Sequence, residues 1–282
     1  MATGVSRTAS GAALCRLVEQ RQPPGLRQFD DPVVAKLVDP ALAAMAGSGV
    51  LLDQLLAPFP PGTYGGLVMR TRYIDEVVVA QVAGGITQLV ILGAGLDTRA
   101  YRLPGLSSVV VFEVDLPAIQ RRKQKSLRGT APVAQEIRFV PVDLGVQPLG
   151  EALRNAGLDA DRPVLFVWEG VTQYLSEAAV RSTLDVVAGS ARGSALVFTY
   201  VLRKEIGHAA RRGWSSGMFQ GFGVVEPWLF GLDQDEVPGF LEEFGLHLVE
   251  DVGDLDYQRR YLRPVGRELP VSAAERVALA AI

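Results

Sequence analysis

The chain has 282 residues, of which 28 are lysine or arginine and 31 are aspartate or glutamate, which gives a net charge of −3. This acidic balance argues against a protein that binds duplex nucleic acid, because such proteins are normally basic. The single cysteine, Cys15, excludes an internal disulfide and an all-cysteine zinc site, and two histidines are too few for a histidine-rich site, so no metal is expected.

The first 85 residues are predicted to form helices and loops. Residues 1–8 are small and polar and are expected to be disordered. The N-terminus lacks the apolar core of a signal peptide, and no stretch of 18 uncharged apolar residues occurs, so we expect a cytoplasmic protein without a membrane partner. Helices are predicted at about 11–21, 33–38, 41–56 and 67–82. These segments together predict an N-terminal helical cap over residues 1–85.

From residue 86 onward, strand and helix patterns alternate. Strands are predicted at 88–93, 108–114, 137–142, 163–168 and 194–201, with helices at about 97–102, 116–127, 148–156 and 176–190. Apolar strands without strict polar alternation indicate burial on both faces, and the alternation with helices favours a doubly wound, mostly parallel sheet with helices on both faces. The fold class is therefore α/β, with a core over residues 86–282.

Residues 203–232 interrupt this alternation with arginines, glycines and aromatic residues, which predicts an inserted lid. A helix at 234–244, a strand at 246–252, a short helix at 254–262 and a last strand in the C-terminal sequence ERVALAAI are predicted to follow.

A glycine turn follows the first predicted strand. Gly93, Ala94 and Gly95 end the apolar run, and a segment compatible with a helix comes next. Glycines at the carboxyl end of a strand let the backbone approach a ligand closely. A dinucleotide fingerprint needs a third glycine where this chain has Thr98, so the turn favours a nucleoside without phosphates. A plain tight turn is the alternative.

Acidic residues end the next three predicted strands. Glu113 and Asp115 lie 20 and 22 residues after Gly93, the spacing at which a carboxylate meets ribose hydroxyls. Asp143 could accept a hydrogen bond from an adenine amino group while Leu144 packs on the ring, and Glu169 ends the fourth strand. Acids that cap a helix or a turn are the alternative. Three acidic strand ends with no basic phosphate cradle predict a cationic nucleoside ligand.

Two arginines in the helix before the glycine turn complete the predicted site. Arg70 or Arg72 could bind a ligand carboxylate, because a guanidinium matches a carboxylate with two hydrogen bonds. The alternative for each is a solvated helix face.

The set of motifs resembles the leucine carboxyl methyltransferase family. The matching segments are FDDPVVAKLV, RTRYID, ILGAGLDTRAYRL, FEVDLPAIQRRK, VDL and EGVTQYL, and they run in order between about Leu14 and Tyr200. The resemblance implies a class I methyltransferase fold with seven strands, the last one antiparallel, and S-adenosyl-L-methionine as cofactor. It also implies that bacterial members O-methylate small metabolites, some of them polyketides.

The resemblance further implies roles for residues at the family's cofactor positions. Arg70, with Arg72 as second choice, would hold the methionine carboxylate, and Asp115 would hold the ribose. The other implied cofactor positions are Gly93, Asp143, Leu144 and Glu169. A lysine of the eukaryotic members is replaced by Arg16, for which the resemblance implies no role.

The acceptor of the methyl group is predicted to be a small-molecule carboxylate or hydroxyl. A carboxylate is already ionised at pH 7, whereas a hydroxyl needs a base. His208, Tyr174 and Arg211 are the candidate catalytic residues, with an ordinary surface histidine and a core tyrosine as the alternatives for the first two. A nicotinamide-dependent oxidoreductase and a non-catalytic S-adenosylmethionine-binding protein remain as alternatives, and the sequence predicts no oligomeric state.

Overall fold

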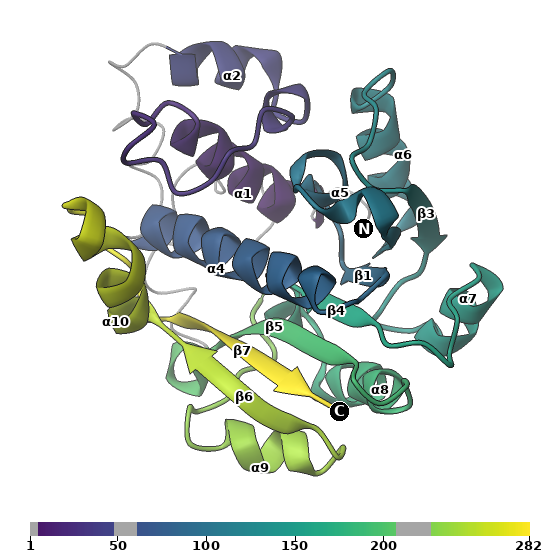
Figure 1. The fold of residues 1–282 in the computed structure, drawn as a ribbon. Coiled ribbons are helices and arrows are strands. Elements are labelled where there is room, and N and C mark those ends of the chain that lie inside the picture. The colour runs from purple at the N-terminus through teal and green to yellow at the C-terminus, as the bar shows by residue number, and fades with distance from the viewer. Residues whose placement is uncertain (1–4, 48–60, 207–226) are drawn as a thin grey trace.

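The computed structural model describes residues 5–47, 61–206 and 227–282. Within these ranges the chain forms one sheet of seven strands in the order β3-β2-β1-β4-β5-β7-β6 (Figure 1). The strands are β1 (Gln88–Leu92), β2 (Val110–Asp115), β3 (Glu136–Pro141), β4 (Leu165–Trp168), β5 (Ala195–Val201), β6 (His247–Val252) and β7 (Glu275–Ala281). β7 runs antiparallel to β5 and β6, and the pairings among β1 to β5 are parallel. The predicted class I methyltransferase topology is therefore confirmed.

The helices lie close to their predicted positions. Those of the described chain are α1 (Val5–Glu19), α2 (Pro40–Gly47), α4 (Thr63–Ala83), α5 (Arg99–Arg102), α6 (Pro117–Ser126), α7 (Leu149–Asn155), α8 (Glu177–Ala188), α9 (Val237–Glu242) and α10 (Asp254–Tyr257). α10 continues into a π-helical turn over Gln258–Leu262, within the helix predicted at 254–262.

Two N-terminal predictions differ from the structure, and part of a third lies outside the described residues. Residues 5–8, expected to be disordered, belong to α1, because extending a helix whose later turns are packed fixes only one more residue for each hydrogen bond gained. The helix predicted at 33–38 is only a 3₁₀ turn, Val34–Lys36, in a segment whose β-branched valines disfavour a helix. Residues 48–56 of the helix predicted at 41–56 lie outside the described residues.

The core has two layers, one on each face of the sheet. Every residue of β1 is buried, and its side chains alternate between the layers, so that Leu89 and Ile91 face one and Val90 and Leu92 the other. α4 covers the first face with residues such as Ile74. α7, α8 and α9 cover the second face. The predicted burial of the central strands on both faces is thus observed.

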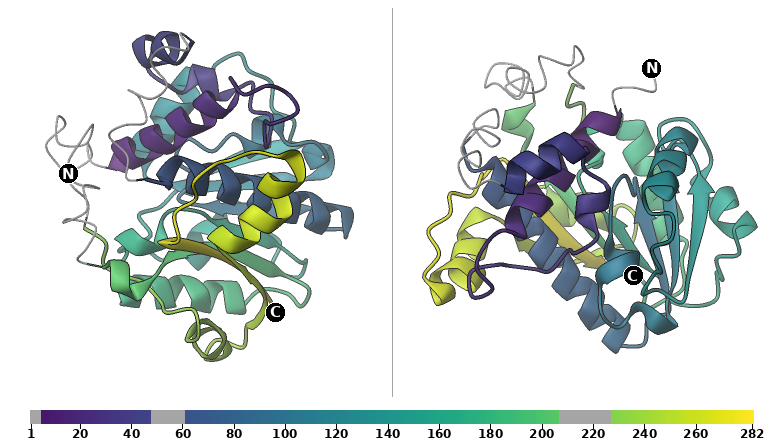
Figure 2. Two further views of the ribbon diagram at one scale, coloured as in Figure 1. Left: turned by 90° about the vertical axis from the view of Figure 1, so that its left-hand side faces the viewer. Right: turned by 90° about the horizontal axis from the view of Figure 1, so that it is seen from above.

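The N-terminal helices α1 and α2 pack together at one end of the molecule, and α1 also contacts α4 (Figure 2). α4 itself packs directly on the sheet. The division into a cap over residues 1–85 and a core over 86–282 stays a prediction.

The two described ends of the predicted lid meet beside β5. Arg203 N donates to the carbonyl of Leu232 (3.1 Å), and Leu232 N donates to the carbonyl of Val201 (3.1 Å). Trp228 and Phe230 are buried in this region, so two of the aromatic residues that suggested a lid pack into the body of the protein. Residues 207–226 lie outside the described residues, and the lid stays a prediction.

The described chain contains no helix long and apolar enough to cross a bilayer. Within the same ranges, no group of three or more histidine, cysteine, aspartate or glutamate side chains is arranged to hold a metal ion.

Candidate active site

A cavity of about 430 Å³ opens at the carboxyl ends of β1, β2 and β4. This is the point where the strand order reverses from β1 to β4, and ligands of doubly wound sheets bind in that crevice. Nine of the residues predicted from sequence line it: Arg70, Gly93, Ala94, Gly95, Asp115, Asp143, Leu144, Tyr174 and Glu169. The tertiary fold therefore brings most of the predicted site into one cavity.

The glycine turn needs its glycines for backbone reasons. Gly93 and Gly95 have φ angles of 66° and 45°, in the left-handed region that other residues rarely adopt. A Cβ atom on Gly93 would also lie 2.4 Å from Cγ2 of Val171, in the loop after β4. Ala94 N donates to the carbonyl of Val114 (2.9 Å), which ties the turn to β2.

Asp115 joins the end of β2 to the glycine turn. Its Oδ2 accepts from Gly95 N (2.5 Å) and its Oδ1 accepts from Leu116 N (2.6 Å). The residue is 8% exposed, and burial raises the pKa of its carboxyl above the ordinary value. Because each carboxylate oxygen can accept a second hydrogen bond, Asp115 can still bind two hydroxyls of a ligand.

Glu113 is not at the cavity, contrary to the prediction. It lies two residues deeper in β2, is 1% exposed, and its Oε2 accepts from Lys123 Nζ of α6 (2.7 Å). Burial raises the pKa of Glu113 even though Lys123 acts in the opposite direction. Residues two apart share a face of a strand, but only the one at the strand end reaches the crevice. The structure therefore gives Glu113 a structural ion pair.

The adenine position predicted for Asp143 and Leu144 lies on the cavity wall, and both residues are half-buried. Asp143 Oδ1 accepts from Gly145 N (2.9 Å), and its backbone N donates to Gln147 Oε1 (2.7 Å). These local bonds fix the turn that follows β3.

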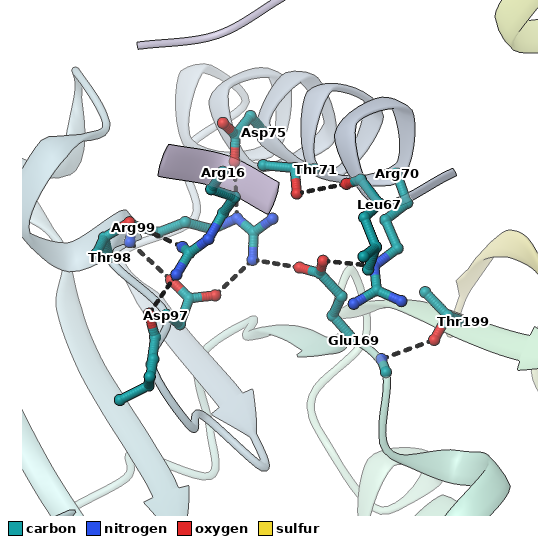
Figure 3. A network of polar contacts seen from close by, with 12 residues as sticks. Arg16, Leu67, Arg70, Thr71, Asp75, Asp97, Thr98, Arg99, Glu169 and Thr199 are labelled. Atoms are coloured by element: carbon teal, nitrogen blue, oxygen red, sulfur yellow. Dashed lines mark hydrogen bonds and ion pairs between the residues drawn. The ribbon is translucent and has the colours of Figure 1, made fainter. Parts of the chain in front are cut away.

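A chain of ion pairs links side chains that line the cavity (Figure 3). Arg70 Nε donates to Glu169 Oε1 (2.8 Å), and Arg99 Nη1 lies 2.8 Å from Glu169 Oε2. Arg99 also contacts Asp97 Oδ2 (2.5 Å) and donates from Nε to Asp75 Oδ1 (2.8 Å). Each carboxylate thus compensates a buried guanidinium, as buried charges require.

The network controls ionisation in the cavity. Burial alone would raise the pKa of Asp97, but the charges of Arg99, Lys123 and Arg16 outweigh it and lower that pKa to about 2. The pKa of Glu169 is likewise lowered, because Arg99 and Arg70 outweigh its burial. Both acids are therefore ionised at neutral pH. The sequence pattern predicted Glu169 as a site residue but not Arg99 or Asp75. The signal that could have indicated Arg99 and Asp75 is that they are charged residues in segments that are buried in the fold.

Arg72 is placed away from the cavity. It lies two residues after Arg70 on α4, about 200° around the helix axis. Its Nε donates to Glu76 Oε1 (2.8 Å) and its Nη1 to the carbonyl of Gln28 (2.7 Å). Of the two predicted arginines, only Arg70 lines the cavity.

Arg16 has a clear structural place behind the glycine turn. Its Nη2 donates to the carbonyl of Leu96 (2.6 Å), and its Nη1 donates to Thr98 Oγ1 (3.0 Å). Thr98 Oγ1 in turn donates to Asp31 Oδ2 (2.7 Å). Arg16 thus holds α1 against the turn while it lines the cavity.

A second cavity of about 70 Å³ adjoins the first. Arg70, Leu67, Gly170 and Tyr174 line both. Tyr174, a predicted catalytic residue, therefore lies at the junction of the two cavities. The other two predicted catalytic residues, His208 and Arg211, lie outside the described residues.

Comparisons with known proteins agree with this fold. The sequence pattern of the leucine carboxyl methyltransferase family matches residues 9–188. A protein of Mycobacterium tuberculosis is 33% identical over 266 residues, which cover 87% of this chain and 84% of the relative. A protein of Mycobacterium sp. (strain JLS) is 38% identical over 210 residues, covering 71% and 68%. The relative from Mycobacterium sp. (strain JLS) is named "Putative S-adenosyl-L-methionine-dependent methyltransferase". The Mycobacterium tuberculosis relative has the same name followed by a locus label.

Two solved structures share the architecture. A DUF574 family protein from Streptomyces avermitilis has a TM-score of 0.57 at 18% identity, covering 88% of this chain and 96% of that one. A protein from Thermobifida fusca whose title names a methyltransferase has a TM-score of 0.55 at 19% identity, covering 93% and 98%. On the extent of the family match and the identity to these relatives, the chain belongs to the leucine carboxyl methyltransferase family.

Proposed function

We propose that this protein is an S-adenosylmethionine-dependent O-methyltransferase that acts on a carboxylate, or a hydroxyl, of a small metabolite. One observation carries the proposal. The cavity gathers the glycine turn, Asp115, the Asp143–Leu144 pair and the Arg70–Glu169 ion pair from five separate parts of the chain. The chemical groups of this set match those of a nucleoside joined to an amino acid.

The cavity residues fit that cofactor in charge and in hydrogen-bonding capacity. Its described lining carries four carboxylates and three guanidiniums, which suits a ligand with a sulfonium charge. Asp115 has acceptor capacity for a ribose diol, and Asp143 beside the apolar Leu144 suits adenine. Arg70 and Glu169 offer partners for a carboxylate and an ammonium group, respectively.

The same geometry disfavours a dinucleotide. Thr98 occupies the third position of the fingerprint, is fully buried, and its hydroxyl is engaged by Arg16 and Asp31. In the dinucleotide fingerprint the third glycine lets the helix pack closely against the strand. A threonine side chain held by two partners at that position does not fit this packing.

The bound cofactor supplies an activated methyl group on a sulfonium. The chain's own contribution is positioning and exclusion of water, which can supply about 7–11 kcal/mol of the barrier at best. The apolar side chains of Leu67, Val171 and Leu229 line the cavity wall, where they would limit the access of water to a bound methyl donor. A carboxylate acceptor needs no base, because it is already ionised at neutral pH. Tyr174 stands where the two cavities join, in a position to orient an acceptor entering from the smaller one.

Isothermal titration calorimetry with S-adenosylhomocysteine tests the cofactor assignment. Wild-type protein should bind it, and Arg70→Gln should weaken binding at least about tenfold, because one charge-assisted pair to a carboxylate is lost. Arg72→Gln is the matched control on the same helix and should bind like wild type. Absence of wild-type binding up to millimolar ligand would overturn the proposal, and NADH binding would favour the oxidoreductase.

Labelled S-adenosylmethionine, incubated with the protein and a metabolite extract, tests catalysis. If the label is transferred to a small molecule and mild alkali then releases it, the product is a methyl ester. If the transferred label is stable to alkali, the product is a methyl ether. Cofactor binding without any transfer would favour a non-catalytic binding protein.

A further inference from the structure

The guanidinium of Arg70 is held on two sides by carboxylates from distant parts of the chain. Its Nη1 donates to both carboxylate oxygens of Glu275, at 2.8 and 2.7 Å, and its Nε donates to Glu169 at 2.8 Å. The third nitrogen, Nη2, makes no hydrogen bond to any residue in the described ranges. It lies against Gly170, where a Cβ atom would be 2.9 Å from it.

Glu275 reaches Arg70 from the side of the smaller cavity. It is the first residue of β7, and its backbone pairs with Val201 of β5. It lines the smaller cavity but not the larger one, whereas Arg70 and Gly170 line both. Its side chain is 20% exposed and that of Arg70 is 11% exposed, so the pair is shielded from water.

We propose that Glu275 is a positioning residue for the cofactor: it clamps Arg70 through Nη1 so that Nη2 is presented at Gly170 to the carboxylate of the amino-acid part. This inference rests on the proposed function. Glu275 acts through Arg70 and touches no cofactor atom itself.

The physical basis is preorganisation. An arginine side chain has several rotatable bonds, and immobilising it on binding costs conformational entropy. The two carboxylates bound to Nη1 and Nε immobilise the Arg70 side chain during folding, so this entropy is not lost again when the ligand binds. One nitrogen, Nη2, is left to face the ligand. The left-handed φ of Gly170 (68°) and its missing Cβ leave the space that Nη2 occupies.

The same contacts allow a rival interpretation, in which Glu275 lowers the affinity for the ligand. If the ligand carboxylate had to displace Glu275 from Arg70, Glu275 would be a competitor, and its neutralisation would tighten binding. The two interpretations therefore predict opposite changes in affinity for the same substitution.

Calorimetry on Glu275→Gln with two ligands tests the proposal. S-adenosylhomocysteine carries the amino-acid carboxylate, and 5′-methylthioadenosine lacks it. The substitution should raise the Kd for S-adenosylhomocysteine about tenfold through the loss of a charged hydrogen-bonded partner, and it should leave the Kd for methylthioadenosine within about twofold of wild type. If the role of Glu275 were purely structural, the substitution would weaken the binding of both ligands to a similar extent.

Two further variants complete the test. Glu268→Gln, an exposed glutamate in the segment before β7, is the matched control and should change neither Kd. Glu275→Asp keeps the charge on a shorter side chain and should give a smaller loss confined to S-adenosylhomocysteine, so it replaces the glutamine variant if that one fails to fold.

Unchanged or tighter S-adenosylhomocysteine binding by Glu275→Gln, or equal weakening of both ligands, would overturn the inference while the proposed function stands. Failure of the wild-type protein to bind either ligand would overturn the proposed function and the inference with it.

Discussion

Replacing Asp115 with asparagine probes the centre of the candidate site. The carboxylate of Asp115 accepts from two backbone N–H groups, at 2.5 and 2.6 Å, and it is 8% exposed. The amide of asparagine keeps the shape but turns one acceptor into a donor, which then faces either Gly95 N–H or Leu116 N–H. The substitution therefore removes one internal hydrogen bond as well as the negative charge offered to a ribose diol.

The expected losses follow from the hydrogen bonds involved. A hydrogen bond to a charged group contributes roughly 1.5–3 kcal/mol, so losing one to the ligand should raise the Kd for S-adenosylhomocysteine by roughly 10- to 150-fold. The unpaired backbone donor should lower the free energy of unfolding by about 1–3 kcal/mol. Calorimetry measures the first quantity, and urea denaturation followed by circular dichroism measures the second.

Asp185→Asn is the matched control, because Asp185 is exposed on α8 and does not line either cavity. It should change neither the affinity nor the stability by more than about 0.5 kcal/mol. If Asp115→Asn binds S-adenosylhomocysteine as tightly as wild type, the ribose assignment of Asp115 is refuted.

Three further predictions concern ionisation, reactivity and backbone conformation. The pKa of Asp97 is lowered from 3.8 to about 2, so ionised Asp97 stabilises the fold above pH 3.8, and this contribution is lost as the pH falls toward 2. The contribution of ionised Asp97 amounts to roughly 2 kcal/mol, of which roughly 1 kcal/mol is lost between pH 5 and 3. The difference in unfolding free energy between wild type and Asp97→Asn, measured by urea denaturation, should therefore narrow by roughly 1 kcal/mol over this pH range. A difference that stays constant with pH would contradict the prediction. Burial raises the pKa of the Cys15 thiol to about 12, so a disulfide reagent at pH 8 should label Cys15 only in denaturant. Rapid labelling of the native protein would instead show that α1 is not packed against the rest of the chain. Gly93→Ala should lower the unfolding free energy by about 1–3 kcal/mol, because φ is 66° and the new Cβ meets Val171; wild-type stability in thermal denaturation would contradict that geometry.

The elements of the core could be predicted from sequence because their signals are local. Each parallel strand from β1 to β5 begins and ends within two residues of its predicted bounds. These strands are short apolar runs bounded by turn residues, and the pattern for a strand buried on both faces differs from that of the amphipathic helices between them. The glycine turn and the acids at strand ends were predictable for the same reason, since parallel strands end at one edge of a sheet.

Burial and long-range pairing were not predictable in this way. Arg70 and Arg72 are equivalent by sequence spacing, yet one lies in the cavity and the other is bound to Glu76, because successive helix residues turn by about 100° and only the packing of α4 decides which side faces inward. Glu113 and Asp115 are both predicted to meet the ligand because they share one face of the strand, but this alternation does not reveal that Glu113 is buried below the crevice.

The local sequence thus specified the strands, the helices and the chemical types of the residues that meet at the carboxyl edge of the sheet. Only the tertiary structure decided which of those charges pair with one another. Arg70 and Glu275 are 205 residues apart and are joined because β7 inserts next to β5. Ion pairs between distant segments depend on burial and orientation, which no local pattern encodes.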